Sequence, residues 1–313
     1  MGLTASSKYN GGLIVLSLIL AHFLHYGKTA FKQPKIYLAL LLCGVGFIAT
    51  TPYAVLDSAK FLTDLRFEAH HYSTGHAGME GNSLEWYLNY MWNTGGGLYL
   101  FAVLGILYGS ILRSKEISLL SIFPLVYFAF ISSFVVRNDR TILPLTPFLF
   151  LLAAWFLIFM FDKLRNLQTE SLRRLFLTVL VILIIAILAL PISNTIADTQ
   201  RLTTVNSRET ARIWIDINLP PGSKVAIESY SPFVNPSKFS VQGFGRMIDH
   251  DAEWYVEQGF DYLVFSQGMY GRFYGDPERY RNEMLQYDNL FRRFNLIKIF
   301  LDGDYEVRVY RVK

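Results

Sequence analysis

Six stretches of the chain are almost entirely apolar, and short polar segments separate them. Each is close to the ~20 residues that a helix needs to cross a hydrocarbon core of ~30 Å. The last contains the uncharged run LFLTVLVILIIAILAL and ends near Pro191. We therefore predict about six membrane-spanning helices. The six stretches cover residues 9–26, 36–53, 97–112, 117–136, 141–161 and 174–192.

The hydrophobic pattern changes after residue 192. Apolar residues now recur with helical spacing or alternate as in strands, between turn signals such as LPPGS at 219–223. About 120 residues are enough to bury a separate core. We predict an α-helical polytopic membrane bundle over 1–192, followed by a small extracytoplasmic α/β domain over 193–313. Its predicted helices are 207–217, 251–258 and 277–293, and its predicted strands are 224–229, 262–266, and 297–301 with 306–312 as a hairpin around Asp302-Gly303-Asp304.

Composition supports a membrane protein. Hydrophobic residues make up 52% and charged residues 17% of the chain, against about 45–50% and about 25% in soluble domains. The net charge of +4 consists of +5 in residues 1–192 and −1 in the remainder. The excess cations lie in short loops between apolar stretches, so the basic pI does not indicate nucleic acid. The single cysteine, Cys43, excludes an intrachain disulfide.

The distribution of Lys and Arg predicts the orientation in the membrane. Alternate loops carry nine and five cations, and the richer side is expected to be cytoplasmic. The loop at 54–96 and the C-terminal domain then face outside a plasma membrane. The richer set consists of Lys28, Lys32, Lys35, Arg113, Lys115, Lys163, Arg165, Arg173 and Arg174, and the other of Lys8, Lys60, Arg66, Arg137 and Arg140.

The external loop 54–96 contains the first candidate chemistry. Residues 57–72 have helical spacing, with Phe61, Leu65, Ala69 and Tyr72 on one face and Asp64, Glu68 and His71 on another. Such a helix is expected to lie in the membrane interface with its apolar face in lipid. Three of the six histidines follow one another closely, at His70, His71 and His76.

These histidines allow three interpretations. With Glu68 and Asp64 they could hold zinc or manganese, since imidazole and carboxylate suit these metals. They could contact a phosphate or a sugar, or they could belong to a solvated loop. The spacing matches no strict metal motif, so we assign no metal or other cofactor and leave a divalent ion as an alternative.

Three cations are expected on the same external face. Arg137 and Arg140 precede the fifth apolar stretch, and Lys8 precedes the first. The planar fork of arginine suits phosphate because it donates two hydrogen bonds at once. Each of these side chains could equally serve as an interface anchor.

Two further groups have competing interpretations. Trp86, Tyr87, Tyr90 and Trp92 are typical of an aromatic belt at a membrane interface, and sugar stacking is the alternative. Residues 249–251, with the sequence Asp-His-Asp, could form an acid/base cluster or a solvated turn and helix cap.

Several segments together resemble a known superfamily. They are GLTASSKYNGG at 2–12, TPYAVLD at 51–57, FEAHHYSTGHAG at 67–78 and DRTILPLTPFLFLLAA at 139–154. The set is similar to the later half of GT-C membrane glycosyltransferases, such as protein O-mannosyltransferases and the lipid A aminoarabinose transferase. ARIWIDINLPPGSKVAIES and DYLVFS also resemble the small extracytoplasmic domain of many such enzymes.

The resemblance implies an activity. Such enzymes take a sugar from a polyprenyl-phosphate carrier on the outer face, where a hydroxyl of a protein, lipid or glycan acceptor attacks the anomeric carbon. An aspartate in the first external loop is the general base, and basic residues near the membrane surface hold the lipid phosphate. The candidate substrate and lipid-phosphate residues are Lys8, Glu68, His71, Tyr72, His76, Arg137 and Arg140.

The chain departs from the family in one respect. It begins at what resembles the sixth span of the family or the end of the fifth, so the first external loop and its aspartate are expected to be absent. Neither Asp57 nor Glu68 matches that position. We therefore expect the C-terminal portion of a glycosyltransferase, from a split or truncated gene, that cannot transfer sugar alone. The alternative is a non-catalytic membrane binding or assembly subunit. A transporter is disfavoured, because the spans contain almost no ionisable residues.

Overall fold

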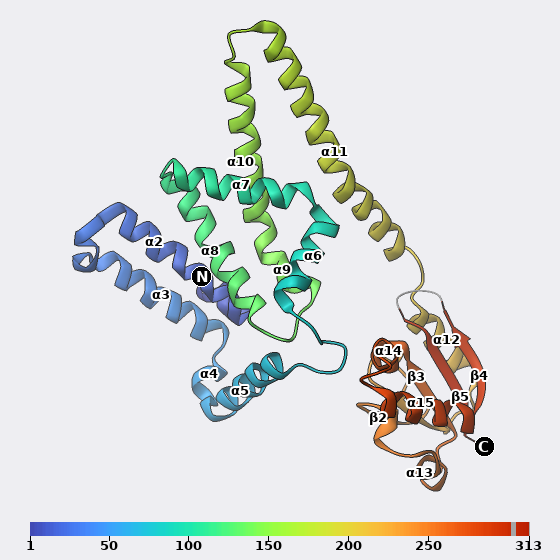
Figure 1. Cartoon of the computed structure of the whole chain (residues 1–313). Coiled ribbons are helices and arrows are strands. Elements are labelled where there is room, and N and C mark those ends of the chain that lie inside the picture. Colours follow the sequence, from blue (N-terminus) through green and yellow to red (C-terminus); the bar gives the residue numbers. More distant parts are fainter. Residues whose placement is uncertain (302–304, 313) are drawn as a thin grey trace. The chain divides into compact units, whose positions relative to one another are not determined.

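The computed structural model describes residues 1–301 and 305–312. The chain divides into two compact units, Met1–Asn194 and Thr195–Lys313, whereas the hydrophobic pattern places the division after residue 192. The first unit is helical and the second combines helices with one sheet (Figure 1). The predicted turn at 302–304 lies outside the described residues.

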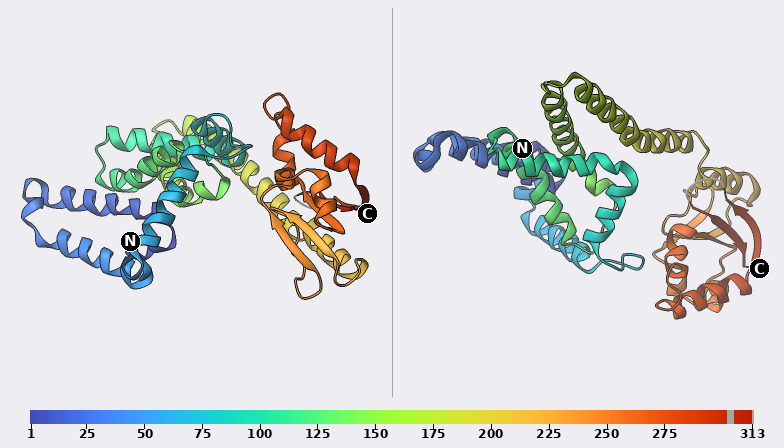
Figure 2. Two further views of the ribbon diagram at one scale, coloured as in Figure 1. Left: turned by 90° about the horizontal axis from the view of Figure 1, so that it is seen from below. Right: turned by 45° about the horizontal axis from the view of Figure 1, so that its top comes forward.

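The first unit is built from helices of very different lengths, with several short helical turns between them, and its last helix, α11, continues past Asn194 into the second unit. Helices α10 and α11 are joined by a short connection and diverge from it (Figure 2). The elements are α1 Gly2–Ser7, η1 Tyr9–Ile14, α2 Val15–Tyr26, η2 Gly27–Lys32, α3 Pro34–Thr50, α4 Tyr53–Leu56, α5 Ser58–Thr74, α6 Ser83–Gly95, α7 Gly97–Ile111, α8 Lys115–Ser132, α9 Asp139–Ile142, η3 Leu143–Leu145, α10 Thr146–Arg165 and α11 Glu170–Leu202.

Four helical segments of the described chain are long and apolar enough to cross a membrane, or five if a bent pair is one span. That pair is α6 with α7, which meet at 113° around Gly96, where φ is +45°. Six spans were predicted, one more than the five obtained when the bent pair is counted as a span. The additional predicted span is α3, an apolar helix of 17 residues, which is about 25 Å long at 1.5 Å per residue.

The core of the first unit lies between α6, α7, α8 and α10. Close packing of α7 on α10 depends on Gly105, where an added Cβ would lie 2.6 Å from the carbonyl oxygen of Leu152. Small residues allow helices in membranes to approach in this way. The fully buried side chains here include Tyr87, Ala102, Ile117, Tyr127, Ile142, Leu145 and Leu152.

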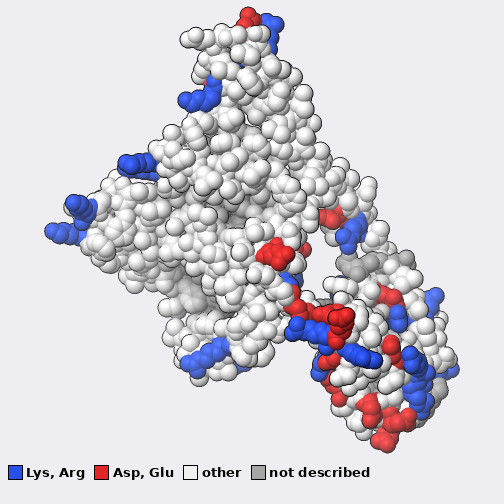
Figure 3. Space-filling view, viewed as in Figure 1, with Lys and Arg blue, Asp and Glu red and all other residues white. Residues whose placement is uncertain are grey.

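Apolar side chains cover much of the outer surface of this unit. In α11, for example, Val179, Ile182 and Ile185 are each at least half exposed. Charged side chains are sparse on the visible face and gather at helix ends (Figure 3). An apolar exterior with few charges suits contact with lipid. The structure therefore agrees with a membrane protein containing several long apolar helices.

The second unit contains a five-stranded sheet of order β2-β1-β3-β5-β4. β1 is parallel to β2 and β3, and β5 is antiparallel to β3 and β4. The strands are β1 Lys224–Glu228, β2 Ser240–Phe244, β3 Tyr262–Ser266, β4 Asn295–Phe300 and β5 Val307–Arg311. The helices are α12 Ser207–Asn218, η4 Met247–Asp249, α13 Ala252–Glu257, α14 Gln267–Tyr274 and α15 Arg281–Arg293.

Helices cover both faces of this sheet. Ala211 and Ile215 of α12 pack with Val264 of β3 on one face. Phe265, the next residue of β3, contacts Tyr287 of α15 on the other. All five residues of β3 are buried, as expected for a strand covered on both sides. The sequence pattern predicted every strand except β2, whose residues Ser-Val-Gln-Gly-Phe lack the usual apolar run.

Candidate functional site

The first unit contains a cavity of about 520 Å³. Its walls come from three parts of the chain that lie far apart in sequence: the α1–η1 junction, helix α5, and the segment from the end of α8 to α9. The lining is largely apolar with a few polar groups. Its residues are Ser6, Ser7, Lys8, Tyr9, Asn10, Leu65, Glu68, Ala69, Tyr72, Phe130, Ile131, Phe134, Val136 and Thr141.

Packing of α1 positions Lys8 at this cavity. Gly2 lies against the backbone of α3, where a Cβ would collide with the carbonyl oxygen of Cys43. Farther along, the hydroxyls of Ser6 and Thr51 are 2.7 Å apart and share a hydrogen bond. α1 then ends at Lys8, whose backbone is extended at φ −157°. The chain turns there into η1, so Lys8 lies between two helical segments.

Lys8 and Arg140 form a pair of neighbouring cations. Burial lowers the pKa of the Lys8 ammonium, and the positive charge of Arg140 lowers it further. Neither side chain forms an ion pair with a carboxylate among residues 1–301 and 305–312. Two nearby like charges disfavour each other, and an anion bound between them would relieve that repulsion. Lys8 lines the cavity, whereas Arg140 is not one of its lining residues and lies near Lys8. The side of the cavity at Lys8 is therefore suited to an anionic group.

Helix α5 contributes the acidic and aromatic part of the wall. Asp57 caps it, because its carboxylate accepts a hydrogen bond from the Lys60 N–H at 3.2 Å. Leu65, Ala69 and Tyr72 line the cavity together with Glu68. The sequence pattern had placed these three residues in lipid, but the structure turns their face toward the cavity. Leu62 and Phe67, on other faces of α5, are more exposed than Leu65, at 46% and 68% against 37%.

The two histidines singled out in the sequence lie beside each other but do not line the cavity. The rings of His71 and His76 stack with their centroids 5.7 Å apart. His76 Nδ1 is 3.0 Å from the carbonyl oxygen of Ala77. Within the described residues, no three His, Cys, Asp or Glu side chains converge in a way that could hold a metal ion. The metal interpretation thus has no geometric support among them.

Arg137 is placed differently from Arg140. It is 8% exposed, and its guanidinium donates to the carbonyl oxygen of Met79 at 3.1 Å and to that of Glu80. The N–H groups of Val135 and Val136 donate to the carbonyl oxygen of Tyr72 at 3.0 and 3.2 Å. These bonds hold the loop after α5 against the end of α8. Arg137 therefore shapes the wall and does not line the cavity.

Asn10 is a cavity residue that the sequence analysis did not select. Its Nδ2 donates to the hydroxyl of Tyr127 at 3.1 Å, and that hydroxyl donates to the carbonyl oxygen of Thr141 at 3.0 Å. The buried Oδ1 has no hydrogen-bond partner in the described structure. Its only signal in the sequence is an amide at the start of an apolar stretch. The Asn10 side chain thus links the cavity wall to Tyr127.

The remaining candidate residues take part in packing or helix capping. Trp86 stacks on Tyr90 at 5.4 Å between ring centroids, and Tyr87 is fully buried in the core. In the second unit, Asp251 caps α13 through the Trp254 N–H, and the His250 ring stacks on Trp254 at 3.7 Å. Asp251 is therefore a helix cap, the second of the two interpretations offered for residues 249–251.

No protein-family model and no curated protein matches this chain. The resemblance to GT-C glycosyltransferases therefore remains a prediction from the residues quoted above.

Proposed function

We propose that the first unit binds the head group of a polyprenyl-phosphate-linked sugar in the cavity, as part of a glycosyltransferase that acts on the outer face of the membrane. The observation that carries this proposal is the pair Lys8 and Arg140, two adjacent cations without a carboxylate partner in the described structure, beside a cavity of about 520 Å³ in an otherwise apolar unit.

The cavity lining fits the two chemical halves of such a molecule. Phe130, Ile131, Phe134 and Leu65 supply apolar surface for the first isoprene units. Lys8 and Arg140 would hold the phosphate, and charge-assisted hydrogen bonds to phosphate are among the strong ones. They would also stabilise the charge that develops on the phosphate as the sugar leaves. Glu68 would accept hydrogen bonds from sugar hydroxyls.

The proposal includes an orientation. The external side of the membrane would carry Lys8, Arg140 and the loop 54–96, together with the second unit. Support comes from the nine-to-five distribution of Lys and Arg between the two sets of loops. Protein, lipid and glycan acceptors all remain compatible with this arrangement.

Binding to the full chain in lipid nanodiscs tests the proposal. A fluorescent short-chain polyprenyl phosphate should bind, and the matching polyprenol should bind much more weakly. Arg140→Ala should weaken binding of the phosphate by about 1.5–3 kcal/mol if one charge-assisted bond is lost, and Lys8→Ala should act in the same direction. Lys28→Ala is the matched control, since Lys28 is an exposed cation outside the cavity. Unchanged affinity in the Lys8→Ala/Arg140→Ala double variant would refute the proposal.

A non-catalytic binding subunit is the second candidate function. The observation that favours it is that Glu68 is the only carboxylate among the residues that line the cavity. Membranes containing the wild-type chain and a polyprenyl-phosphate sugar distinguish the two. Sugar transfer that Glu68→Gln abolishes, with carrier binding retained, would support the enzyme. Carrier binding without transfer would support the binding subunit.

A further inference from the structure

The sheet of the second unit has a topological switch point at the carboxyl ends of β1 and β3. From β1 the chain passes to β2 on one side and later to β3 on the other, and all three strands are parallel. In open sheets of parallel strands, ligands bind outside the carboxyl ends at such a point. The residues that follow β1 and β3 are therefore the first place to search for a ligand site in this unit.

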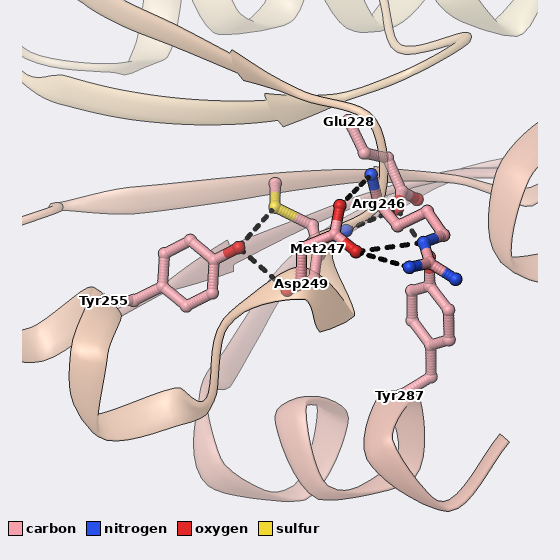
Figure 4. A network of polar contacts seen from close by, with 6 residues as sticks. All are labelled: Glu228, Arg246, Met247, Asp249, Tyr255 and Tyr287. Atoms are coloured by element: carbon pink, nitrogen blue, oxygen red, sulfur yellow. Dashed lines mark hydrogen bonds and ion pairs between the residues drawn. The ribbon is translucent and has the colours of Figure 1, made fainter. Parts of the chain in front are cut away.

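A buried carboxyl group fixes the strand ends at this edge. Glu228, the last residue of β1, accepts a hydrogen bond from the Ser266 N–H at 2.7 Å. It also accepts bonds from the Tyr287 hydroxyl at 3.0 Å and the Met247 N–H at 3.4 Å (Figure 4). Glu228 is 3% exposed, so its side chain stabilises the interior and is not accessible to a ligand. A ligand at this edge must contact the residues beyond it.

The loop directly after β1 contains a backbone outlier. Tyr230 has φ +68°, a conformation that a bulky L-residue rarely adopts. Such residues persist where the surroundings hold them, and they cluster at functional sites. Here the Arg272 guanidinium lies 4.7 Å from the ring centroid, and its Nη2 donates to the Tyr230 hydroxyl at 2.5 Å. The Tyr230 side chain is nevertheless 43% exposed.

A second tyrosine lies beside the first. The ring centroids of Tyr230 and Tyr305 are 6.4 Å apart, and Tyr305 is 38% exposed. The guanidinium of Arg208, in α12, lies 5.9 Å from the Tyr305 ring. Two partly exposed aromatic rings are thus flanked by two guanidinium groups at the switch point. We call Tyr230, Tyr305, Arg208 and Arg272 the tyrosine–arginine patch.

We propose that the tyrosine–arginine patch binds an acidic saccharide, meaning a sugar ring that carries a carboxylate or a phosphate. The C–H groups on one face of a sugar ring pack against an aromatic ring, and a guanidinium donates charge-assisted hydrogen bonds to anionic oxygens. A peptide is less suited, because β1 and β3 are each paired on both sides and offer no free edge for strand addition. This site lies in the second unit and does not depend on the function proposed for the first.

The test uses the full chain in nanodiscs and isothermal titration calorimetry. The probes are a uronic-acid oligosaccharide, a hexose phosphate, a neutral oligosaccharide of equal length, and inorganic phosphate. At least one acidic saccharide should bind at least tenfold more tightly than the neutral one and than inorganic phosphate. No binding of either acidic saccharide, or equal binding of inorganic phosphate, would overturn the proposal.

Two variants locate the binding. Tyr230→Gly removes the ring and suits the positive φ, so it should weaken binding at least tenfold while the exchange protection of β1 is kept. Arg208→Ala should also weaken binding, whereas Arg293→Ala, which removes an exposed arginine paired with Glu253, should not. If Tyr230→Gly lowers the protection of β1, the Arg208→Ala result decides. Wild-type affinity in Arg208→Ala would then place the sugar elsewhere and refute the proposal.

Discussion

Two arginines three positions apart show how differently single residues are used in this protein. Arg137 is buried and donates to backbone carbonyl groups of the loop after α5, whereas Arg140 is exposed and lies near Lys8. Both have the same charge and the same apolar context in the sequence. Among the described contacts, the Arg140 guanidinium donates no hydrogen bond to the carbonyl groups of this loop.

Arg137→Ala should therefore loosen the loop at 75–83, because partly buried carbonyl groups would lose charged donors worth about 1.5–3 kcal/mol each. Limited proteolysis of the full chain in nanodiscs measures this. Cleavage in the loop should be ~10-fold faster or more, since about 1.4 kcal/mol is a factor of ten. Arg140→Ala is the control and should leave the cleavage rate unchanged. Equal cleavage in the two variants would contradict the structural role of Arg137.

Glu228 predicts how the stability of the second unit depends on pH. Burial raises the pKa of its carboxyl to about 8, although the N–H of Ser266, the Tyr287 hydroxyl and the N–H of Met247 act against that rise. In the unfolded chain the group titrates near 4.5. The folded state then holds a proton that the unfolded state has lost, so stability should fall as pH rises from 4.5 to about 8.

Hydrogen exchange of β1 and β3, corrected for intrinsic rates, measures this dependence in the full chain. Protection in the wild type should decrease across that interval. Glu228→Gln should remove most of the slope, since glutamine does not titrate there. A variant with the wild-type slope would show that another group is responsible.

At the scale of elements, the contact between α7 and α10 depends on the absence of a side chain. An added Cβ at Gly105 would lie 2.6 Å from the Leu152 carbonyl oxygen, which belongs to the helix backbone and cannot rotate away. At Gly44 of α3, in contrast, an added Cβ would have no atom within 4 Å beyond its own helical surroundings. The two glycines have the same intrinsic helix propensity, but Gly105 lies against another helix and Gly44 faces open space.

Gly105→Ala should therefore destabilise the first unit by about 1–3 kcal/mol, the usual range for overpacking a tight contact. Thermal unfolding in one detergent, followed by circular dichroism, measures the change as a lower midpoint. Gly44→Ala is the matched control and should be neutral or slightly stabilising, because alanine favours the helix. A similar midpoint for both variants would show that α7 and α10 can separate without cost.

For the whole molecule, the orientation proposed above makes the two ends of α11 face opposite sides of the membrane. In a Cys43→Ser background, Ser237→Cys in the second unit should react with an impermeant thiol reagent on intact cells. Gln168→Cys, in the connection between α10 and α11, should react only after permeabilisation. Both positions are exposed, so access to the reagent depends on the membrane. The reverse labelling pattern would invert the proposed orientation.

The sequence by itself determined what depends on neighbouring residues. Apolar runs located the long helices. Alternation over 224–229 and a short, mostly apolar run over 262–266 located two central strands, because burial of a helix or strand imposes a local pattern. The Asp251 cap was an available interpretation for the same reason. The pattern failed at β2, where Ser-Val-Gln-Gly-Phe has no strong period.

Only the tertiary structure decided which polar residues meet. Lys8, Glu68 and Thr141 line one cavity although they are separated by 60 residues or more in sequence. The pairing of α1 with α3 and of the loop after α5 with the end of α8 brings them together. The same long-range packing explains why Arg137 contacts the loop after α5. It also explains why Tyr72 and Asn10 line the cavity, although the sequence pattern had placed Tyr72 in lipid. The sequence specifies which side chains are present, but a site forms only where packing brings distant segments of the chain together.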